Sequence, residues 1–532
     1  VGGEFGSVPK TDSVQLRVAL SFPEIYEIAM SNSAIRILYQ WLNGIPGVAC
    51  ERVFAPATDF EVELADRSIP LYTLETGTFL ADTDIVAFSI GYELLATNVI
   101  TILKAGNIPI RSESRGHRDP IVVAGGPGVT NPAPWEAMID AIYVGEFEHQ
   151  FYDLVCRMKD LRARGADRQD LMAVLKQSNN VWYAGRSNPA QRAIWTGFGT
   201  QDSSIVKTTF PVPTLRSVQD HGVVEIMRGC PQGCRFCHAG VFYRPYRMKD
   251  HDWICREVRE LVDRYGYRDI TLSSLSSGDY EDLYGLIGRL NEEFGSRGIN
   301  FQVPSLRVNS FTLPLLEELS RVRKSHLTFA VETATPEGQH VVNKLVPLDR
   351  TIAILREAKA RGWRSAKFYF MIGLPGPNGS TESRDILAYV NTVKQAVSGI
   401  QLTVNVGTFV PKPHTPFQWD SQIGEIDALG RISDIKHGLP KGVSFRYQSP
   451  FMSTLEGVLS RGSRHLTDAL IEAHGRGARF DAWQEHCDRD LWYGIFKDFP
   501  TSTEGLGPRD IDGALPGGGV ASRVAKARLQ RK

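Results

Sequence analysis

The sequence contains little cysteine and no long apolar run. Its 532 residues include seven cysteines, a small and odd number that does not suit the disulfide framework of a secreted domain. No segment approaches the roughly 18 consecutive apolar residues of a transmembrane helix. The first ten residues lack the charged and apolar regions of a signal peptide. These absences predict a cytoplasmic protein that does not associate with a membrane.

The sequence also lacks an excess of charge of either sign. Lys and Arg together number 60, as do Asp and Glu, so no overall field favours nucleic acid or an anionic surface. The composition therefore leaves a nucleic-acid partner open without supporting one. A chain of this length exceeds one ordinary hydrophobic core, so we expect two to four domains.

The first part of the chain alternates short apolar runs with helical patterns. Strands are expected over 14–21, 84–90, 120–126 and 140–146, with a helix over 31–43. Buried strands that alternate with helices predict a doubly wound, Rossmann-like parallel sheet, which binds ligands at the carboxyl ends of its strands.

The same rhythm resumes at residue 223 and predicts a second α/β domain. Six strands are expected, over 223–226, 269–274, 300–308, 326–332, 366–373 and 401–410. Six β/α units in series predict a partial (β/α)6 barrel, with its chemistry at the carboxyl ends of the strands. The expected division is a Rossmann-like domain over 1–160, a connecting segment over 161–221, the barrel over 222–436, a small mixed, α-rich region over 437–500 and a weakly ordered tail over 501–532.

Three of the seven cysteines, Cys230, Cys234 and Cys237, lie directly after the first expected barrel strand. Together with His238, the last two form C-x-x-C-H, the attachment motif of c-type haem. A C-x-x-C pair can also supply half of a zinc site, but a second pair of ligands is missing here. Three thiolates can instead hold three irons of a [4Fe–4S] cluster and leave the fourth iron open. The third cysteine and the expected compartment favour the cluster.

The spacing C-x-x-x-C-x-x-C, with aromatic Phe236 before the last cysteine, resembles the radical S-adenosylmethionine (SAM) superfamily. The resemblance implies that the open iron is chelated by the amino and carboxylate groups of SAM. Electron transfer then cleaves SAM and yields a 5′-deoxyadenosyl radical. It also implies an external electron donor of the flavodoxin or ferredoxin type.

The resemblance continues along the later barrel strands, each of which supplies a SAM contact in this family. The turn after the second strand, the third strand, the fourth strand and the glycine motif of the fifth strand occur here in that order. With Phe236, they give these SAM-binding candidates: Ser277, Gly278, Asp279, Ser305, Arg307, Glu332, Gly373 and Pro375.

A proline-rich stretch, "FVPKPHTPFQW", follows the sixth expected strand. It resembles the same stretch in radical SAM proteins that include methylthiotransferase relatives and cobalamin-linked members. Proline makes this loop rigid, so it would hold Lys412 and His414 at the barrel mouth. We name both as candidate substrate contacts.

A Rossmann-like domain before the barrel resembles the cobalamin-binding subgroup of the superfamily. The resemblance implies cobalamin as a further cofactor and gives these candidate contacts: Tyr26, Ser89, Tyr92, Glu93, Gly125, Gly126 and Gly145. Many members carry a histidine after the first strand that binds cobalt from below. This chain has Tyr26 at the matching position, so that ligand is absent.

These resemblances imply a radical SAM enzyme that transfers a methyl group to an unactivated carbon with the help of cobalamin. The alternative is a cobalamin-independent enzyme that modifies RNA or a ribosomal component. A third alternative is a non-enzymatic iron–sulfur protein. The sequence assigns neither the substrate, whether small molecule or macromolecule, nor a catalytic acid or base.

Overall fold

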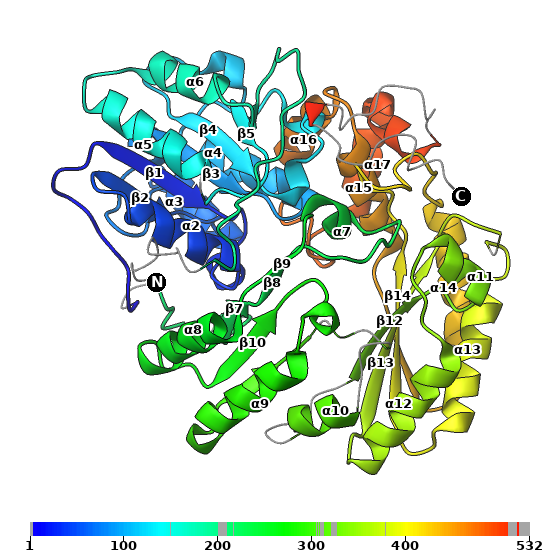
Figure 1. Ribbon diagram of the computed structural model, residues 1–532. Coiled ribbons are helices and arrows are strands. Elements are labelled where there is room, and N and C mark those ends of the chain that lie inside the picture. The colour runs from blue at the N-terminus through cyan, green and yellow to red at the C-terminus, as the bar shows by residue number, and fades with distance from the viewer. Residues whose placement is uncertain are drawn as a thin grey trace.

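The structure, a computed structural model, describes residues 4–148, 150–200, 210–215, 217–304, 306, 308, 313–320, 327–377, 379–508 and 519–520. Two SAM-binding candidates, Ser305 and Arg307, lie outside the described residues, as do 509–518 and 521–532 of the expected tail. Figure 1 shows an N-terminal sheet domain, a barrel beneath it and a group of C-terminal helices beside both. No helix of the described part is long and apolar enough to cross a membrane.

The N-terminal domain is a six-stranded sheet in the order β2-β1-β3-β4-β5-β6. Its first five strands are parallel, and β6 pairs antiparallel with β5. The strands are β1 (Leu16–Ser21), β2 (Val48–Arg52), β3 (Ile85–Ser89), β4 (Ile121–Gly125), β5 (Ala141–Tyr143) and β6 (Val181–Trp182). The helices are α1 (Tyr26–Ala29), α2 (Ser33–Asn43), α3 (Thr58–Asp66), α4 (Ala96–Ala105), α5 (Gln150–Arg162) and α6 (Arg168–Lys176). The predicted doubly wound sheet is confirmed, and its strand order changes direction at β1 and β3, where such sheets bind ligands.

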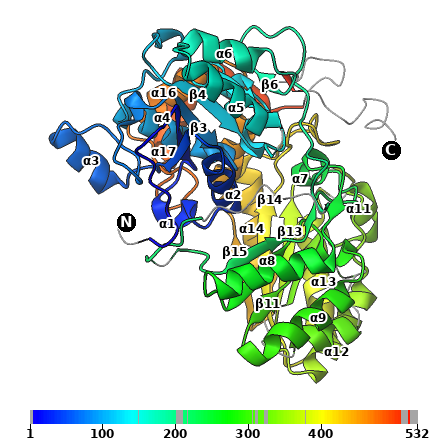
Figure 2. The ribbon, with the colours of Figure 1, turned by 60° about the vertical axis from the view of Figure 1, so that its left-hand side comes forward.

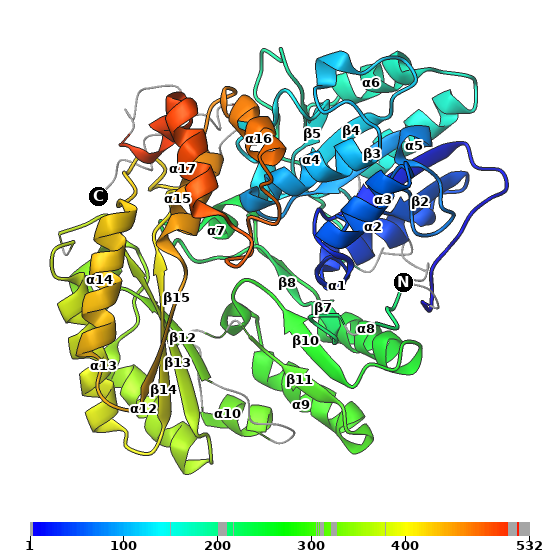
Figure 3. The ribbon, with the colours of Figure 1, turned by 180° about the vertical axis from the view of Figure 1, so that it is seen from behind.

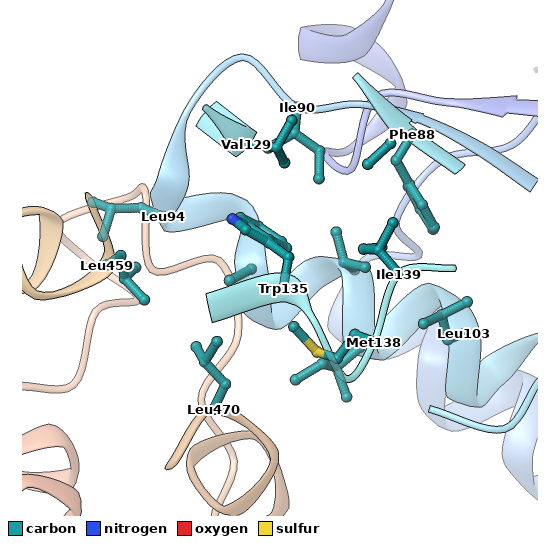
Figure 4. Close-up of a cluster of buried hydrophobic side chains, with 14 of the residues drawn as sticks. Phe88, Ile90, Leu94, Leu103, Val129, Trp135, Met138, Ile139, Leu459 and Leu470 are labelled. Carbon is teal, nitrogen blue, oxygen red and sulfur yellow. The ribbon is translucent and has the colours of Figure 1, made fainter. Parts of the chain in front are cut away.

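Both faces of this sheet are buried. Strand residues alternate between two hydrophobic cores; Leu20 faces the core built with α2, α5 and α6, whereas Ala19 faces the one that includes α4. The core on the α4 face also contains residues of the C-terminal helices α15 (Pro450–Arg461), α16 (Leu466–Gly475) and α17 (Arg489–Asp498). Figure 4 shows Trp135 at its centre, with Leu459 and Leu470 of those helices beside it. The end of the chain therefore completes the domain that the beginning of the chain starts.

The barrel consists of two parallel sheets rather than one. The first has the order β11-β10-β7 and the second β12-β13-β14-β15. The strands are β7 (Gly222–Glu225), β10 (Asp269–Ser273), β11 (Asn300–Gln302), β12 (Leu327–Glu332), β13 (Ser365–Ile372), β14 (Gln401–Thr408) and β15 (Val443–Tyr447). Figures 2 and 3 show helices on the outer side of both sheets. They are α8 (His251–Asp263), α9 (Leu283–Phe294), α10 (Leu313–Ser320), α12 (Leu348–Ala360), α13 (Glu382–Ala396) and α14 (Glu425–Gly438).

The structure differs from the sequence-based division at two places. The segment 161–221, expected as a connection, contains α6 and β6, which extend the N-terminal sheet and its core. Strand β15, in the expected α-rich region, adds a seventh parallel strand to the barrel. Its sequence, VSFRY, alternates apolar and polar residues over only five positions. A pattern this short does not distinguish a strand from a helix or a loop.

Candidate active site

The three clustered cysteines lie in one loop at the carboxyl end of β7. A short antiparallel hairpin, β8 (Met227–Arg228) with β9 (Arg247–Met248), closes the base of this loop. Helix α7 (His238–Phe242) begins directly after Cys237, whose sulfur accepts a hydrogen bond from the Gly240 N–H at 3.2 Å. The cysteines therefore lie where a β/α barrel carries its chemistry.

The cysteine loop is shielded from solvent. Cys230 and Cys234 are buried, and burial together with these two neighbours raises the pKa of the Cys237 thiol. A bound metal would replace the protons of these thiols. Among the described residues, no three Cys, His, Asp or Glu side chains converge on a single metal ion. A [4Fe–4S] cluster does not require such convergence, since each thiolate binds a different iron.

The cysteine loop is tied to the turn after β10. The Gln232 amide donates hydrogen bonds to both carboxylate oxygens of Asp279, at 2.8 and 2.9 Å, and the Ser276 hydroxyl donates to the same carboxylate at 2.6 Å. Ser277 is fully buried, and its hydroxyl lies 2.8 Å from that of Ser274. The predicted Ser277–Gly278–Asp279 turn thus lies beside the cysteine loop, and Asp279 orients both.

The other side of the loop rests on α11 (Pro336–Val341) and the residues after it. The Arg235 N–H donates to the Val342 carbonyl at 3.0 Å, and the Asn343 amide donates to the Gly233 carbonyl at 2.9 Å. Glu332, at the end of β12, has the left-handed φ of 69° and forms an ion pair with Lys344 at 2.7 Å. A left-handed glutamate is uncommon and marks a constrained position. The Lys344 ammonium lies 6.0 Å from the Phe236 ring centre, so both SAM-binding candidates meet at this lysine.

The glycine motif after β13 occupies the next strand end. Gly373 has a φ of 78°, and a Cβ atom there would come within 2.7 Å of the Ile423 side chain. Its N–H donates to the Glu382 carboxylate at 2.8 Å, so glycine is required at this position by the protein's own packing. Pro375 follows in the same turn and is partly exposed.

The two candidate substrate contacts both contact the N-terminal domain. Lys412 forms ion pairs with Glu93 and with Glu456 of α15, each at 2.7 Å. His414, buried and with a φ of 65°, lies with Nε2 3.1 Å from the Thr130 carbonyl oxygen. Both side chains are therefore bound to other protein groups where the barrel meets the N-terminal domain and the C-terminal helix α15.

The Thr130 hydroxyl lies 3.2 Å from His238 Nε2. Burial, together with the charges of His414 and Lys412, lowers the pKa of His238 to about 3, so its imidazole is neutral. Thr130 follows β4 and thus links an N-terminal strand end to the residue after Cys237. The sequence analysis missed Thr130, because nothing in its local pattern indicates a partner 108 residues away.

The candidate cobalamin contacts fall into two groups. Ser89, Gly125, Gly126 and Gly145 line a cavity at the carboxyl edge of the N-terminal sheet. Tyr26 does not line it; the Tyr26 hydroxyl donates a hydrogen bond to Glu4, and its ring packs edge-on against Phe54.

Tyr92 and Glu93 are held by other protein groups. Tyr92 donates to Glu456 at 2.6 Å, and Glu93 pairs with Lys412. Among the glycines, Gly126 and Gly145 have positive φ and lie against the backbone of Ile90 and Ala193, where a Cβ atom would come within 2.4 and 2.3 Å of a carbonyl oxygen. A Cβ atom on Gly125 would meet nothing closer than 3.5 Å, so Gly125 leaves room on the cavity side.

The cavity has a volume of about 530 Å³ and lies between the two domains. One wall is the carboxyl edge of β1, β3, β4 and β5. The other wall comprises Val223 and Glu225 of β7, Ser273 of β10, and Phe242 and Tyr243 at the end of α7. The volume is typical of cofactor sites, and the cavity reaches from the Gly-rich strand ends to the helix that follows the cysteine loop.

The inner face of the second barrel sheet is open. Register places Ala330, Tyr369, Asn405 and Arg446 side by side, and Tyr369 is 41% exposed. Because the outer faces of these strands pack on α12, α13 and α14, only this inner face is available to a ligand.

Family models agree with this geometry. Residues 34–183 match the N-terminal domain of radical SAM proteins, and residues 224–384 match the radical SAM superfamily. The fold and the cysteine loop define a β/α-barrel enzyme with SAM and a [4Fe–4S] cluster as cofactors. The two matches together cover more than half of the chain, and the protein belongs to the radical SAM superfamily.

Relatives of known sequence span different shares of the chain. An uncharacterised protein of Methanocaldococcus jannaschii is 24% identical over 469 residues, which is 85% of this chain and 94% of that protein. The anaerobic magnesium-protoporphyrin IX monomethyl ester cyclase of Rubrivivax gelatinosus is 24% identical over 48% of this chain and 45% of its own length. An uncharacterised methyltransferase of Pyrococcus horikoshii is 25% identical over 48% of this chain and 54% of its own length.

The fold is that of a solved methyltransferase. TsrM of Kitasatospora setae, solved with cobalamin and a [4Fe–4S] cluster bound, superposes with a TM-score of 0.57 at 13% identity. The superposition covers 87% of this chain and all of that one. The likeness therefore includes the N-terminal sheet as well as the barrel, and confirms the predicted two-domain fold.

Proposed function

We propose that this protein is a cobalamin-dependent radical SAM enzyme that transfers a methyl group to an unactivated carbon atom. The cavity between the N-terminal sheet and β7 is the observation that carries the proposal. In parallel α/β sheets, ligands bind at this edge, and here the edge faces the element that follows the cysteine loop. A fold shared over the full length of a cobalamin-bound methyltransferase supports it.

The lining of the cavity suits a large cofactor with amide substituents. Gly125 leaves its wall without a side chain, so a flat ring could approach the backbone there. Ser89, Ser273 and Glu225 offer hydroxyl and carboxylate groups for hydrogen bonds, while Phe242 and Tyr243 supply apolar contact. Such a mixture of apolar walls with a few polar groups is typical of cofactor sites.

The lining includes no histidine among the described residues. Because Tyr26 is engaged with Glu4 away from the cavity, it cannot replace the missing lower ligand. We therefore propose that the residues of this cavity would hold cobalamin without a histidine ligand to cobalt. The visible spectrum of the reconstituted protein would test this by the absence of histidine coordination.

The residues at the barrel mouth would hold the other two cofactors. Cys230, Cys234 and Cys237 would bind three irons, and Asp279 and Glu332 would contact SAM at neighbouring strand ends. When bound, the cluster supplies the electron that cleaves SAM, and cobalamin carries the methyl group to be transferred. An external flavodoxin or ferredoxin would reduce the cluster. The protein's own residues orient these groups and exclude water.

The proposal is tested by anoxic purification and reconstitution with iron, sulfide and hydroxocobalamin. After gel filtration we expect retained iron, retained cobalamin with its visible spectrum, and 5′-deoxyadenosine when SAM and dithionite are added. Cys234→Ala should lose iron and fall to background in SAM cleavage. Cys156→Ala, a partly exposed cysteine of α5 outside the loop, is the matched control and should behave as the wild type.

Two results would contradict separate parts of the proposal. Equal 5′-deoxyadenosine from wild type and Cys234→Ala would remove the cluster assignment. A wild-type sample that keeps its iron yet never retains cobalamin would remove the cobalamin-dependent transfer and leave a cobalamin-independent radical SAM enzyme.

A further inference from the structure

The cavity between the two domains has a balanced group of charges at one end. Three arginines and three glutamates form ion pairs there: Arg192, Arg228, Arg247, Glu146, Glu148 and Glu225. This end lies next to the cysteine loop, since Arg228 precedes Cys230 by two residues. Because the six charges compensate one another, this end of the cavity carries no excess charge of either sign.

A second cation, Arg36 of α2, lines the cavity at its other end. The guanidinium carbon of Arg36 lies 5.5 Å from the ring centre of Phe210 and 5.9 Å from that of Tyr267. Tyr267 lies just before β10, which pairs with β7 from Gly222 onward. Glu225 ends β7, roughly 10 Å farther along the strand. Arg36 is therefore set apart from the balanced group.

The charge of Arg36 is not compensated in the same way. Its Nη2 donates to the Met30 carbonyl oxygen at 3.2 Å, and no carboxylate among the described residues forms an ion pair with it. Burial lowers the pKa of His221, and the charge of Arg36 lowers it further, with a larger effect than the opposing charge of either Asp269 or Asp220. Arg36 is partly exposed, and arginine stays ionised in proteins, so this end of the cavity is positive.

The terminal nitrogens of Arg36 are the atoms that a ligand could reach. Its Nε is buried without a partner, whereas the side chain as a whole is partly exposed and lines the cavity. A guanidinium group can donate two parallel N–H bonds to an oxyanion, and it matches the geometry of phosphate and carboxylate groups. Among the described residues that line the cavity, Arg36 and Arg228 are the cations, and the glutamates already occupy Arg228.

We propose that Arg36 binds the phosphodiester group of cobalamin, and that this contact fixes which end of the cavity holds the nucleotide part of the cofactor. The inference rests on the proposed function. The phosphodiester is the ionised acid of cobalamin at neutral pH, since the groups around the corrin ring are neutral amides. A single negative charge on the ligand therefore meets the single uncompensated cation of the lining.

The test is ligand binding, independent of turnover. Equilibrium dialysis of the full-length, iron-containing protein would compare hydroxocobalamin, cobinamide phosphate and cobinamide. Cobinamide lacks both the phosphate and the nucleoside, whereas cobinamide phosphate lacks the nucleoside alone. The wild type should bind cobinamide phosphate about tenfold or more tightly than cobinamide, which is the scale of a hydrogen bond between charged groups.

Variants of Arg36 separate a phosphate contact from a structural role. Arg36→Gln should bind both phosphate-containing ligands about tenfold more weakly and should change the affinity for cobinamide by less than about twofold. A purely structural role would weaken all three ligands alike. Arg36→Met keeps the apolar stem beside Phe210 and Tyr267, and it repeats the measurement if Arg36→Gln does not fold.

The matched control is Arg186→Gln. Arg186 also lies near an aromatic ring, that of Tyr183 at 5.9 Å, and donates to backbone carbonyls, but it does not line the cavity. Its loss should leave the affinities for all three ligands unchanged. Circular dichroism and retained iron check the fold of each variant.

The outcomes distinguish this inference from the proposed function. A wild type that binds cobinamide phosphate no more tightly than cobinamide overturns the assignment of Arg36, as does a folded Arg36 variant that keeps the wild-type preference or weakens all three ligands equally. A folded, iron-containing wild type that binds none of the three ligands overturns the proposed function, and with it the premise of this inference.

Discussion

The N-terminal sheet and the second barrel sheet are both parallel, but they differ in what covers them. The N-terminal sheet has a hydrophobic core on each face, and Leu20 and Val86 are almost fully buried on opposite faces. The second barrel sheet has a core only on its outer face, and its inner face carries Lys367, Tyr369 and Arg446.

This difference separates scaffold from binding surface. A sheet covered on both faces can meet a ligand only at its edge, and the cavity lies at that edge in the N-terminal domain. A sheet with an open inner face can hold a ligand over its width. The four predictions that follow test this contrast from the largest expected effect to the smallest.

Lys412 lies where the two regions join, so its loss should have the largest effect on stability. Lys412→Met leaves the buried Glu93 and the partly buried Glu456 without their shared cation, which should lower the free energy of unfolding by about 3–5 kcal/mol. Urea unfolding would measure it. The matched control, Arg67→Met, breaks the exposed Arg67–Glu63 pair and should change stability by less than about 1 kcal/mol. If Lys412→Met and Arg67→Met changed the free energy of unfolding equally, the ion pairs of Lys412 would contribute no more to stability than an exposed pair.

A substitution in the core of the N-terminal sheet should have the next largest effect on the free energy of unfolding. Leu20→Ala removes a side chain that is 1% exposed and should lower the free energy of unfolding by about 2–5 kcal/mol. The same urea titration applies. A loss below 1 kcal/mol would contradict the description of this face as closely packed.

On the opposite face of the N-terminal sheet, His474 of α16 should make the free energy of unfolding depend on pH. Burial, with smaller contributions from Arg479 and Lys104, lowers the pKa of His474 to about 3, so the folded protein keeps it neutral. The unfolded chain binds the proton below its ordinary pKa of 6.5, so the stabilisation is complete above that pH and is lost as pH falls toward 3. Between pH 7 and pH 5 the loss should be about 2 kcal/mol. His474→Gln should flatten this slope, and an unchanged slope would assign it to other groups.

An inner-face substitution should have the smallest effect on stability. Tyr369→Ala removes a side chain that is 41% exposed, so the free energy of unfolding should change by about 0.5 kcal/mol or less. SAM cleavage without substrate should persist, because Tyr369 lies within β13 rather than at a strand end, and the cysteine loop follows β7 of the other sheet. A loss comparable to that of Leu20→Ala would show that this face is part of a core.

Most strands could be predicted because each has its own local pattern. The runs at 269–274, 326–332, 366–373 and 401–410 became β10, β12, β13 and β14 with boundaries shifted by at most two residues. Strands β2, β6, β8, β9 and β15 were missed, and the strand expected over 300–308 is only three residues long, β11 (Asn300–Gln302). β6 has only two residues and β15 a short, half-exposed pattern, so neither is distinctive without its neighbours in the sheet.

The candidate site was predictable where chemistry lies in consecutive residues. The cysteine loop and the 277–279 turn lie side by side after the paired strands β7 and β10, and Glu332 ends β12 of the second sheet; their roles in binding stay predictions. The protein contacts of Lys412 and His414 were not predictable, because their partners Glu93 and Thr130 lie about 300 residues earlier in the chain. The ion pairs around Arg228 likewise join four segments of the chain, at 146–148, 192, 225–228 and 247.

The alternation of strands and helices, the three-cysteine loop and the resemblance to the radical SAM superfamily can be read from the amino-acid sequence, because each depends on residues that are neighbours along the chain. Contacts between distant segments instead make the C-terminal helices part of the N-terminal core, divide the barrel into two sheets, and pair Arg228 with both Glu148 and Glu225. Such contacts depend on which buried faces meet and which charges lose their water together, and no local pattern records either.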